Sequence, residues 1–373
     1  MSTFQLTFDG APADDALYSS ISALEVEENA DLPSALRMTL PVALDSSGDL
    51  TFVGDARFKP FANVAVVVNA DGQTSHCIFD GYVLSHKLHV DSGVTSSTLE
   101  VWAQDATWMM NLEEKVREWA DVTDADVAST IFGEYGITPA DDNSSDDSPS
   151  HTEDKHTLMQ RASDIQFLRM LARRNGKLCR VACTDTPGDR TGYFAKPAVD
   201  GDAAVRIPLH DPQSPAVDAL DFEWDVTRPS AVKASQALFD DNTPTGVSGD
   251  ASDSGLTPLD ARDLPTFAGQ TMTVLLTTPV DDAGELMQRA QSVLRESGWF
   301  VRCEGEVDAA RLQDVIRAGT VVQIDAAGSL NSGKYFVWSV RHTIAPDSHR
   351  MRFTLVRNAV GPEAGGGGLL GGL

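Results

Sequence analysis

Cysteine is scarce in this sequence. The 373 residues include four cysteines, at Cys77, Cys179, Cys183 and Cys303. A disulfide framework requires a much higher density of cysteine in a much shorter chain. We therefore expect these residues to be free, buried thiols.

Positive charge and long apolar runs are scarce as well. The chain has 29 basic and 55 acidic residues, and its formal net charge of −26 repels the phosphates of nucleic acids. The apolar run at residues 64–68 is far shorter than the ~20 residues that cross a membrane. The first five residues have neither the basic flank nor the apolar segment of a secretory signal. We expect synthesis in the cytoplasm, no specific nucleic acid partner and no direct membrane insertion.

The excess of acidic residues has two interpretations. It fits a protein adapted to high salt, and it also fits the wall of a channel that must not retain polyanionic cargo. The sequence does not separate the two.

Catalytic motifs are missing too. The chain contains no glycine-rich phosphate loop, no nucleophile elbow and no zinc-protease helix motif. Glu304 and Glu306 point to the same side of a predicted strand, as a glycosidase pair would, but such pairs are expected by chance among so many acidic residues. His86, His89 and His342 fit strand or turn positions better than catalytic ones. We predict that the protein is not an enzyme and binds no cofactor, with a cell-wall glycosidase as the alternative.

Two groups of residues could in principle hold a metal ion. A zinc interpretation rests on His151, His156, Cys179 and Cys183. A calcium interpretation rests on oxygen ligands of an acidic loop, at Asp141, Asn143 and Asp146. The spacing of the first group does not impose tetrahedral geometry, and the second lacks the turn glycine and the closing glutamate of a calcium loop. We predict no metal site.

The first 110 residues have the pattern of β structure. Segments with alternating or continuous apolar residues lie between turn signals, at residues 4–8, 24–28, 36–40, 64–68, 77–85 and 97–102. This spacing predicts a small antiparallel barrel or sandwich.

The middle of the chain changes to a helical period. Thr123 and Asp126 fit a capping box at the start of one helix. A second helix is predicted over 156–176, with another capping box at Ser163 and Gln166, and a strand follows at 177–183. Three arginines give the second helix a basic side, at Arg169, Arg173 and Arg174. That side is either solvated or in contact with an acidic neighbour, so these residues are interface candidates.

The last third returns to short strands. Residues 220–226, 230–238 and 271–276 are predicted as strands of a second β unit, with a long loop at 240–263. A helix over 281–297 then leads into strands at 300–306, 320–325, 335–342 and 351–357, an order that predicts the closing of a barrel.

Several stretches resemble, in the right order, the phage tail hub family known as late control protein D. They are Phe79-Asp80-Gly81-Tyr82-Val83 followed by Trp102, Ser163-Asp164-Ile165-Gln166-Phe167-Leu168 up to Asn175-Gly176, Trp299-Phe300-Val301-Arg302, Gly333-Lys334-Tyr335-Phe336-Val337-Trp338, and Phe353-Thr354-Leu355-Val356-Arg357. The hub part of type VI secretion spike proteins is related to this family.

The resemblance implies a mainly β fold with an α+β insertion, built from two tandem tube-like antiparallel β-barrels. It assigns the first barrel to 1–112, the α/β insertion to 113–205 and the second barrel to 206–361 with an inserted helix at 281–297. Residues 362–373 would form a flexible Gly/Leu-rich tail. Three chains would make a pseudo-sixfold ring.

The resemblance also implies partners. The homotrimer would join a hexameric inner tube ring to a trimeric spike within a baseplate that includes wedge components, with cargo or a tape measure in the lumen. Because the sequence stops at Leu373, we expect the spike to be a separate polypeptide. The tail leucines are candidates for reaching it, at Leu369, Leu370 and Leu373. The particle would be a phage tail, a tailocin or an extracellular injection system, and a monomeric glycan-binding module is a further alternative.

Overall fold

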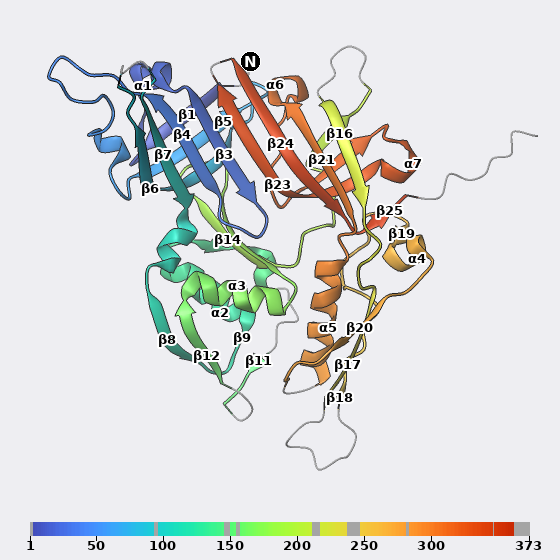
Figure 1. The fold of residues 1–373 in the computed structure, drawn as a ribbon. Helices are drawn as coiled ribbons and strands as arrows, with labels where there is room; N and C mark the ends of the chain where they lie inside the picture. Colours follow the sequence, from blue (N-terminus) through green and yellow to red (C-terminus); the bar gives the residue numbers. More distant parts are fainter. Residues whose placement is uncertain are drawn as a thin grey trace, which may run out of the picture.

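The computed structural model describes residues 3–92, 96–144, 150–153, 157–210, 217–236, 247–280, 283–345 and 347–361. Strands dominate, and additional helices gather mainly below the large sheet (Figure 1). The prediction of a mainly β protein with additional helices is confirmed.

One large sheet organises the molecule. Its main path runs through β16 (Val217–Trp224), β21 (Val301–Asp308), β24 (Ser348–Arg357), β23 (Gly333–Ala345), β3 (Ala23–Asn29), β4 (Ala35–Pro41), β7 (Thr98–Asp105), β6 (His76–His89), β5 (Asn63–Asn69), β1 (Thr3–Phe8) and β2 (Ala11–Pro12). Off this path, β22 (Val321–Asp325) pairs with β23 and with β15 (Val205–Pro208). The pair β15–β22 is parallel, and the other pairs of this sheet are antiparallel.

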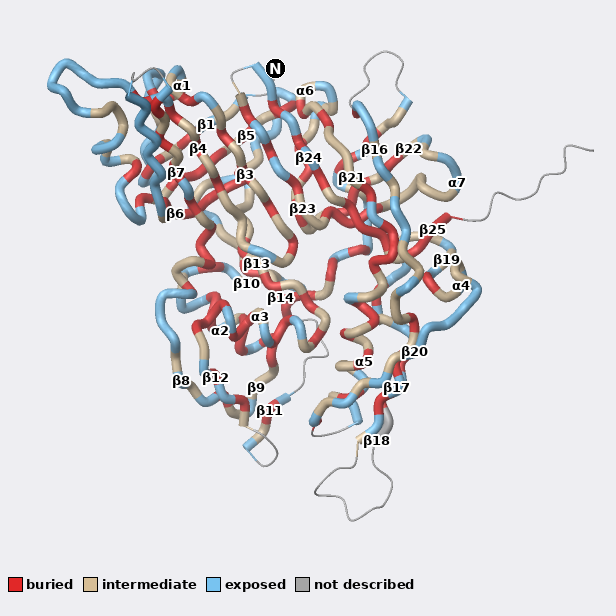
Figure 2. The backbone as a smooth tube through the Cα atoms, in the orientation of Figure 1, coloured by how far each residue is buried: buried red, intermediate tan, exposed pale blue. Residues whose placement is uncertain are grey.

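Alternation of apolar and polar residues explains why these segments form strands. In β3, Leu24 and Val26 point into the core while Glu25 and Glu27 are only half-buried. Successive strand residues point to opposite faces, so one face of the sheet is apolar and the other polar. Figure 2 shows buried and less buried positions alternating along the strands. The largest apolar core includes residues of both β parts of the chain, from Leu6 to Val360.

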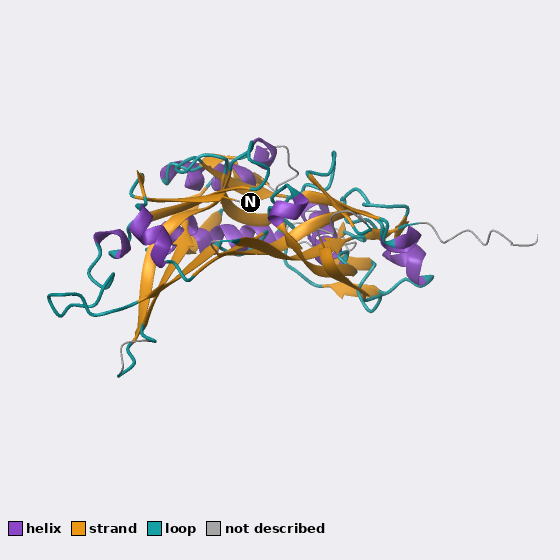
Figure 3. Ribbon diagram, turned by 90° about the horizontal axis from the view of Figure 1, so that it is seen from above, coloured by secondary structure: helices purple, strands orange, loops and turns teal. Residues whose placement is uncertain are grey.

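The expectation of barrel closure needs a correction. Among the described strands no barrel closes, and the two β parts are joined edge to edge because β23 pairs with β3. Seen from above, the strands lie along a curved layer (Figure 3). The alternating segments were predicted largely where strands occur, but local patterns say nothing of which strands pair across 300 residues.

An α/β region lies below one half of the sheet (Figure 1). It contains α2 (Asp124–Glu134), α3 (Asp164–Arg174), β8 (Glu114–Trp119), β9 (Val122–Thr123), β10 (Thr138–Pro139), β11 (Ser150–His151), β12 (Leu158–Ser163), β13 (Leu178–Cys183) and β14 (Arg190–Ala195). It has its own apolar core, in which Phe132, Phe167 and Phe194 are buried. The boundaries proposed for three domains and a tail remain a prediction.

Of the two predicted capping boxes, one is confirmed. Thr123 and Asp126 form the reciprocal capping box of α2. The second helix starts at Asp164 and not near residue 156, because the preceding residues pair with β8 as the strand β12. Ser163 is the N-cap of α3 but its hydroxyl caps no helix amide, and it donates instead to Asn111 Oδ1 at 2.6 Å.

A second region lies below the other half of the sheet. Here β17 (Ala231–Gln236) pairs with β18 (Val247–Ser248) and β20 (Thr273–Leu276), and α5 (Ala283–Ser297) packs on them. Of the three strands predicted for the second β unit, β16 joins the large sheet, whereas β17 and β20 belong to this separate small sheet. Nearby, β19 (Arg262–Asp263) and α4 (Leu264–Ala268) meet β25 (Ala359–Val360).

The remaining helices are short: α1 (Asp15–Ser20), α6 (Ala309–Leu312), α7 (Gly328–Asn331) and the 3-10 turns η1 (Ala56–Phe58), η2 (Ala106–Asn111) and η3 (Asp141–Ser144). No helix in the described part of the chain is both long and apolar enough to cross a membrane. The four cysteines are free thiols as predicted, but Cys183 is only half-buried, whereas the other three are buried. Burial raises the pKa of Cys179 and of Cys303 to about 12.

Candidate functional site

The large sheet contains the same five-strand unit twice. In chain order the first unit is β3, β4, β5, β6 and β7, and the second is β16, β21, β22, β23 and β24. In space both follow the order first, second, fifth, fourth, third: β3-β4-β7-β6-β5 and β16-β21-β24-β23-β22. A short helix precedes the third strand in each unit, η1 before β5 and α6 before β22. The units follow one another head to tail, because β23 of the second unit pairs with β3 of the first.

A β-bulge fixes how the two units correspond residue by residue. The β6–β7 register shifts between Val83 and Ser85, and the β23–β24 register shifts between Val337 and Ser339. Leu84 therefore corresponds to Trp338, and Lys87 to Arg341. Bulges re-aim a strand, and their recurrence at one place in both units supports a structural repeat.

The polar face of the sheet carries a row of ion pairs. They are Arg37–Glu25, Arg341–Glu27, Arg302–Glu304, Arg350–Glu306 and Lys87–Glu100. These residues lie on one face because the strand registers bring them opposite one another or two residues apart. Although the chain is strongly acidic, the carboxylates of this face are thus largely matched by arginine and lysine.

Among the strand edges that have no partner in the described strands, two lie on opposite sides of the sheet. β16 pairs only with β21 there, and its other edge is open. β5 covers residues 76–82 of β6, which leaves 84–89 paired with β7 alone. Exposed apolar side chains accompany these edges: Leu88 is 40% exposed, Val90 55% and Trp224 54%. Such edges invite pairing with another chain.

The pairing of β23 with β3 joins the two units inside the chain. It shows how side chains are placed at the positions that correspond, by the repeat, to the two open edges. Across β23–β3, His342 lies opposite Val26 and Ile344 opposite Leu24, and all four are at most 3% exposed. On the polar face Arg341 donates to Glu27. Beneath it, buried Glu28 accepts from Arg317 Nε at 2.6 Å and from the Ala318 amide at 3.0 Å.

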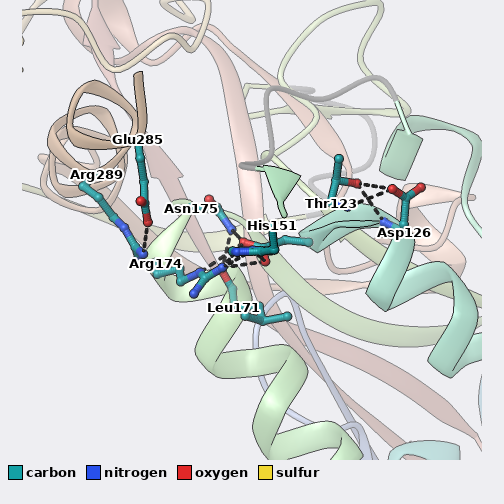
Figure 4. Close-up of polar contacts among 9 residues, drawn as sticks. Thr123, Asp126, His151, Leu171, Arg174, Asn175, Glu285 and Arg289 are labelled. Atoms are coloured by element: carbon teal, nitrogen blue, oxygen red, sulfur yellow. Dashed lines mark hydrogen bonds and ion pairs between the residues drawn. The ribbon is translucent and has the colours of Figure 1, made fainter. Parts of the chain in front are cut away.

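The three arginines of α3 differ in their surroundings. Arg174 does contact an acidic neighbour, because its guanidinium binds both oxygens of Asp124, a fully buried carboxylate. His151 and Asn175 bind the same carboxylate, and Figure 4 shows them converging with Arg174. Burial raises the pKa of Asp124, but its bond to His151 and the charge of Arg174 outweigh this, so the net pKa lies below the usual value. Arg174 is thus held by its own chain.

The other predicted interface candidates remain predictions. Arg169 is half-buried, and its charge, with that of Arg173, opposes the burial that raises the pKa of Asp31. Arg173 is exposed and lines a groove beside α3. Leu369, Leu370 and Leu373 lie outside the described residues.

The residues considered for catalysis lie in unrelated settings. Glu304 and Glu306 are each held by an arginine on the polar face, Glu304 by Arg302 and Glu306 by Arg350. His86 and His89 belong to the exposed half of β6. His342 is fully buried and its Nδ1 lies 3.0 Å from Nε2 of His349.

The described residues do not support the zinc and calcium hypotheses. His156 and Asp146 lie outside the described residues. Cys179 is buried in an apolar core, and Asn143 uses both ends of its side chain on the backbone of β14, donating to Gly192 O and accepting from Phe194 N. The part of the chain that the structure describes contains no cluster of three His, Cys, Asp or Glu side chains suited to a metal.

The residues of the open edges escaped the sequence reasoning. A signal was present, since Val83-Leu84-Ser85-His86-Lys87 and Val337-Trp338-Ser339-Val340-Arg341 share valine, serine and a cation at the same spacing. Three shared residue types in five are a weak sequence signal. The bulges at Leu84 and Trp338 show that the two segments occupy equivalent places in the two units.

Solved structures with this fold come from tail and secretion proteins. The 43 kDa tail protein of prophage MuSo2 from Shewanella oneidensis superposes with a TM-score of 0.65 at 15% identity, over 96% of this chain and 100% of that one. A tail protein from Neisseria meningitidis MC58 gives 0.63 at 13% identity, over 96% and 98%. The E. coli c3393 protein, described as a type VI secretion component similar to phage T4 gp27 and gp5, gives 0.57 at 12% identity, over 96% and 79%. At such identities these likenesses establish the fold.

Sequence comparison adds a family. A search of curated proteins found no match. The model of one protein family, described as the Alg8 N-terminal domain, matches residues 1–346. The match covers the first five-strand unit and the second unit through β23, together with the regions inserted below them, and ends before β24. The chain therefore belongs to the Alg8 N-terminal domain family.

Proposed function

We propose that this protein is the structural hub of a contractile tail or injection particle and has no catalytic activity. Three copies form a ring that meets the hexameric inner tube at one end and a separate trimeric spike at the other, with wedge components outside. The tail proteins and the type VI secretion component that share its fold support this role. The proposal includes membership of the hub family known as late control protein D.

The repeated five-strand unit is the observation that carries the proposal. A chain with two equivalent units offers six units when three copies assemble, so a threefold ring can match a sixfold partner. The tube-like barrel of the proposal is then closed by the assembly. Each copy contributes a curved, open sheet to it.

The junction inside the chain supplies the rule for joining copies. There, the C-terminal half of β23 pairs antiparallel with β3. The same rule applied between copies pairs residues 84–89 of β6 with β16 of the neighbour. The bulge alignment places Lys87 opposite the neighbour's Glu223, as Arg341 lies opposite Glu27. Both open edges would then have a partner strand, and their exposed apolar side chains would lie in the contact between copies.

The proposed pairing of residues 84–89 of β6 with β16 of the neighbour is called the seam. The seam would bury apolar surface on its inner side. By the same correspondence Leu88 faces Phe222, Val90 faces Leu220 and His86 faces Trp224, at the places that are filled by buried residues in the junction inside the chain. Full burial of an aliphatic or aromatic side chain contributes about 1.5–3 kcal/mol. Since each ring has three seams, these contacts favour closure.

The paired charges of the polar face alter the expectation for the channel. If this face lines the lumen, the wall is close to neutral and offers passing cargo or a tape measure few unpaired charges of either sign. The net charge of −26 then resides mainly elsewhere. This favours the outer surface as its location.

The mass of the particle tests the hub. Light scattering on the purified protein alone should give about three times 40.0 kDa, and complexes purified after co-expression with neighbouring spike and tube genes should contain three copies of this chain. A strict monomer in both preparations overturns the proposal and favours the monomeric glycan-binding module. Release of sugars from peptidoglycan by the purified protein would favour the glycosidase instead.

A further inference from the structure

The two ends of the proposed ring are not alike. The crossovers with the short helices η1 and α6 belong to both units, and α6 lies at the upper end in Figure 1. At the lower end, β3 is joined to β4 by residues 30–34 alone, whereas residues 225–300 separate β16 from β21. The α/β region follows β7 at this end as well (Figure 1). The lower end therefore has one copy of each insertion per chain, and threefold character.

A groove opens at this lower end between α3, α5, the start of β21, the middle of β23 and the C-terminal end of β24. Its volume is about 720 Å³. Five cationic residues line it, Arg173, Lys177, Arg228, Arg295 and Arg302, together with two carboxylates, Asp31 and Glu296. The groove is thus basic in a chain with a net charge of −26.

Three of the cations are accessible to a partner. Arg173 is exposed on α3, and the side chains of Arg228 and Arg302 are 39% and 54% exposed, although Arg228 also pairs with Asp225 at 3.4 Å and Arg302 with Glu304. Lys177 and Arg295 lie beneath them and hold the groove together. The Lys177 ammonium lies 4.5 Å from the centre of the Phe194 ring, and Arg295 donates to the carbonyl oxygens of Asn175 and Ser254.

The groove also has apolar surface. Trp299 stacks on Phe336 with ring centres 5.6 Å apart, and Trp338 packs against the same ring. Trp299 and Trp338 both line the groove. Aromatic surface beside accessible arginines is typical of recognition sites for peptide segments.

We infer that this groove seats an acidic segment of the threefold partner at the lower end, which on the proposed function is the spike. Guanidinium groups bind carboxylates through paired hydrogen bonds, so a segment with several Asp or Glu residues binds Arg173 and adds a second carboxylate to Arg228 and Arg302, which each have one partner in the chain. The inference rests on the proposed function for the identity of the partner.

The groove occurs once per chain, and this suits a threefold partner. Its counterpart at the seam between copies would have Leu84 in place of Trp338 and Ala35 in place of Arg302. The seam also has no insertion equivalent to the segment that carries α5. A ring therefore presents three basic grooves and no second set of three.

A peptide probe tests the inference without the spike. An acetylated decaglutamate peptide is titrated into the full chain in 0.1 M salt, where screening over about 10 Å leaves the local charges of the groove dominant. Binding is followed by calorimetry and by tryptophan fluorescence. We expect binding that weakens as salt is raised, and at least tenfold weaker binding by the double variant Arg173→Glu and Arg228→Glu.

Two controls make the outcome decisive. Arg206→Glu reverses an exposed cation of β15 outside the groove and should leave binding within twofold. A thymidine decanucleotide, which is also polyanionic, should bind less tightly than the peptide. No binding by the wild type, equal binding by the double variant, or tighter binding of the oligonucleotide would each overturn the inference. Because the trimer mass is measured separately, failure of the groove and failure of the ring remain distinguishable.

Discussion

Arg341 Nη2 donates to Glu27 Oε2 at 2.7 Å across the junction where β23 of the second unit meets β3 of the first. These residues are 314 positions apart in the sequence. By the internal repeat, Lys87 and Glu223 occupy the same places on the two open edges. The Arg341–Glu27 pair therefore predicts the register in which β6 of one copy pairs with β16 of the next, with Lys87 opposite Glu223.

The first prediction concerns charge at that register. Glu223→Lys should weaken assembly because it places like charges together at each of three seams, although one exposed ion pair contributes only about 0–1 kcal/mol. The exchanged variant Lys87→Glu with Glu223→Lys should recover most of the loss. Sedimentation velocity over a concentration series measures the shift. Equal weakening by the single and exchanged variants would contradict the pairing.

The second prediction concerns the apolar side of the seam. Leu88→Asp should leave the monomer folded, because the side chain is already 40% exposed, yet should reduce the trimer at least tenfold by placing a carboxylate in the seam. The matched control is Leu275→Asp, which alters an 81% exposed leucine of β20 outside the seam. Light scattering compares the two, and a comparable loss in both would argue against a specific seam.

A third prediction concerns the buried carboxylate of the α/β region. Asp124→Ala leaves Arg174, His151 and Asn175 without their common partner and should reduce the free energy of unfolding by about 3–5 kcal/mol. Asp126→Ala removes only the capping box of the same helix and should cost about 1 kcal/mol. Urea unfolding of both variants measures the difference. Similar costs would mean that the cluster is weakly coupled to folding.

The fourth prediction is a dependence of stability on pH. Burial lowers the pKa of His349 to about 4 and that of His342 well below its usual value, whereas both titrate near 6.5 when unfolded. Between pH 6.5 and about 4 the unfolded chain binds protons that the folded chain does not, so stability falls as the pH falls. Each histidine contributes a slope of about 1.4 kcal/mol per pH unit.

Urea unfolding between pH 5 and 7.5 measures that slope. His349→Gln should remove the contribution of one histidine, while His210→Gln, which alters an exposed residue, should leave the slope unchanged. A slope that is the same in the wild type and in His349→Gln would show that this histidine titrates alike in both states.

Local patterns in the sequence were enough for most elements of the fold. The capping box at Thr123, the helix before Gly298 and the strands from β21 to β24 follow from spacing alone. Local patterns were not enough where a segment whose sequence pattern favours a helix forms a strand. The segment at 158–163 forms β12 because β8 provides its partner, and the paired residues lie between 39 (Leu158 and Trp119) and 49 (Ser163 and Glu114) positions apart in the sequence.

The candidate site was harder to predict because it depends on pairing over long distances. Arg174 finds Asp124 across 50 residues, and the periodicity of α3 could indicate a basic side but not its partner. The open edges become visible only when every strand has been paired, since an edge is defined by the absence of a neighbour among the described strands. Side-chain alternation indicates which face of a strand is buried, not which edge is free.

The most direct test of the ring is a disulfide across the seam. In the variant Lys87→Cys with Glu223→Cys, oxidation should link the copies head to tail, because the two positions are predicted to be opposite neighbours, within the Cα separation of roughly 4.4–6.8 Å that a disulfide spans. The expected result on a denaturing, non-reducing gel is a closed covalent trimer of about three times 40.0 kDa. The shifted pair Lys87→Cys with Asp221→Cys should link poorly. A monomer alone, or equal linking by the shifted pair, would contradict the proposed ring.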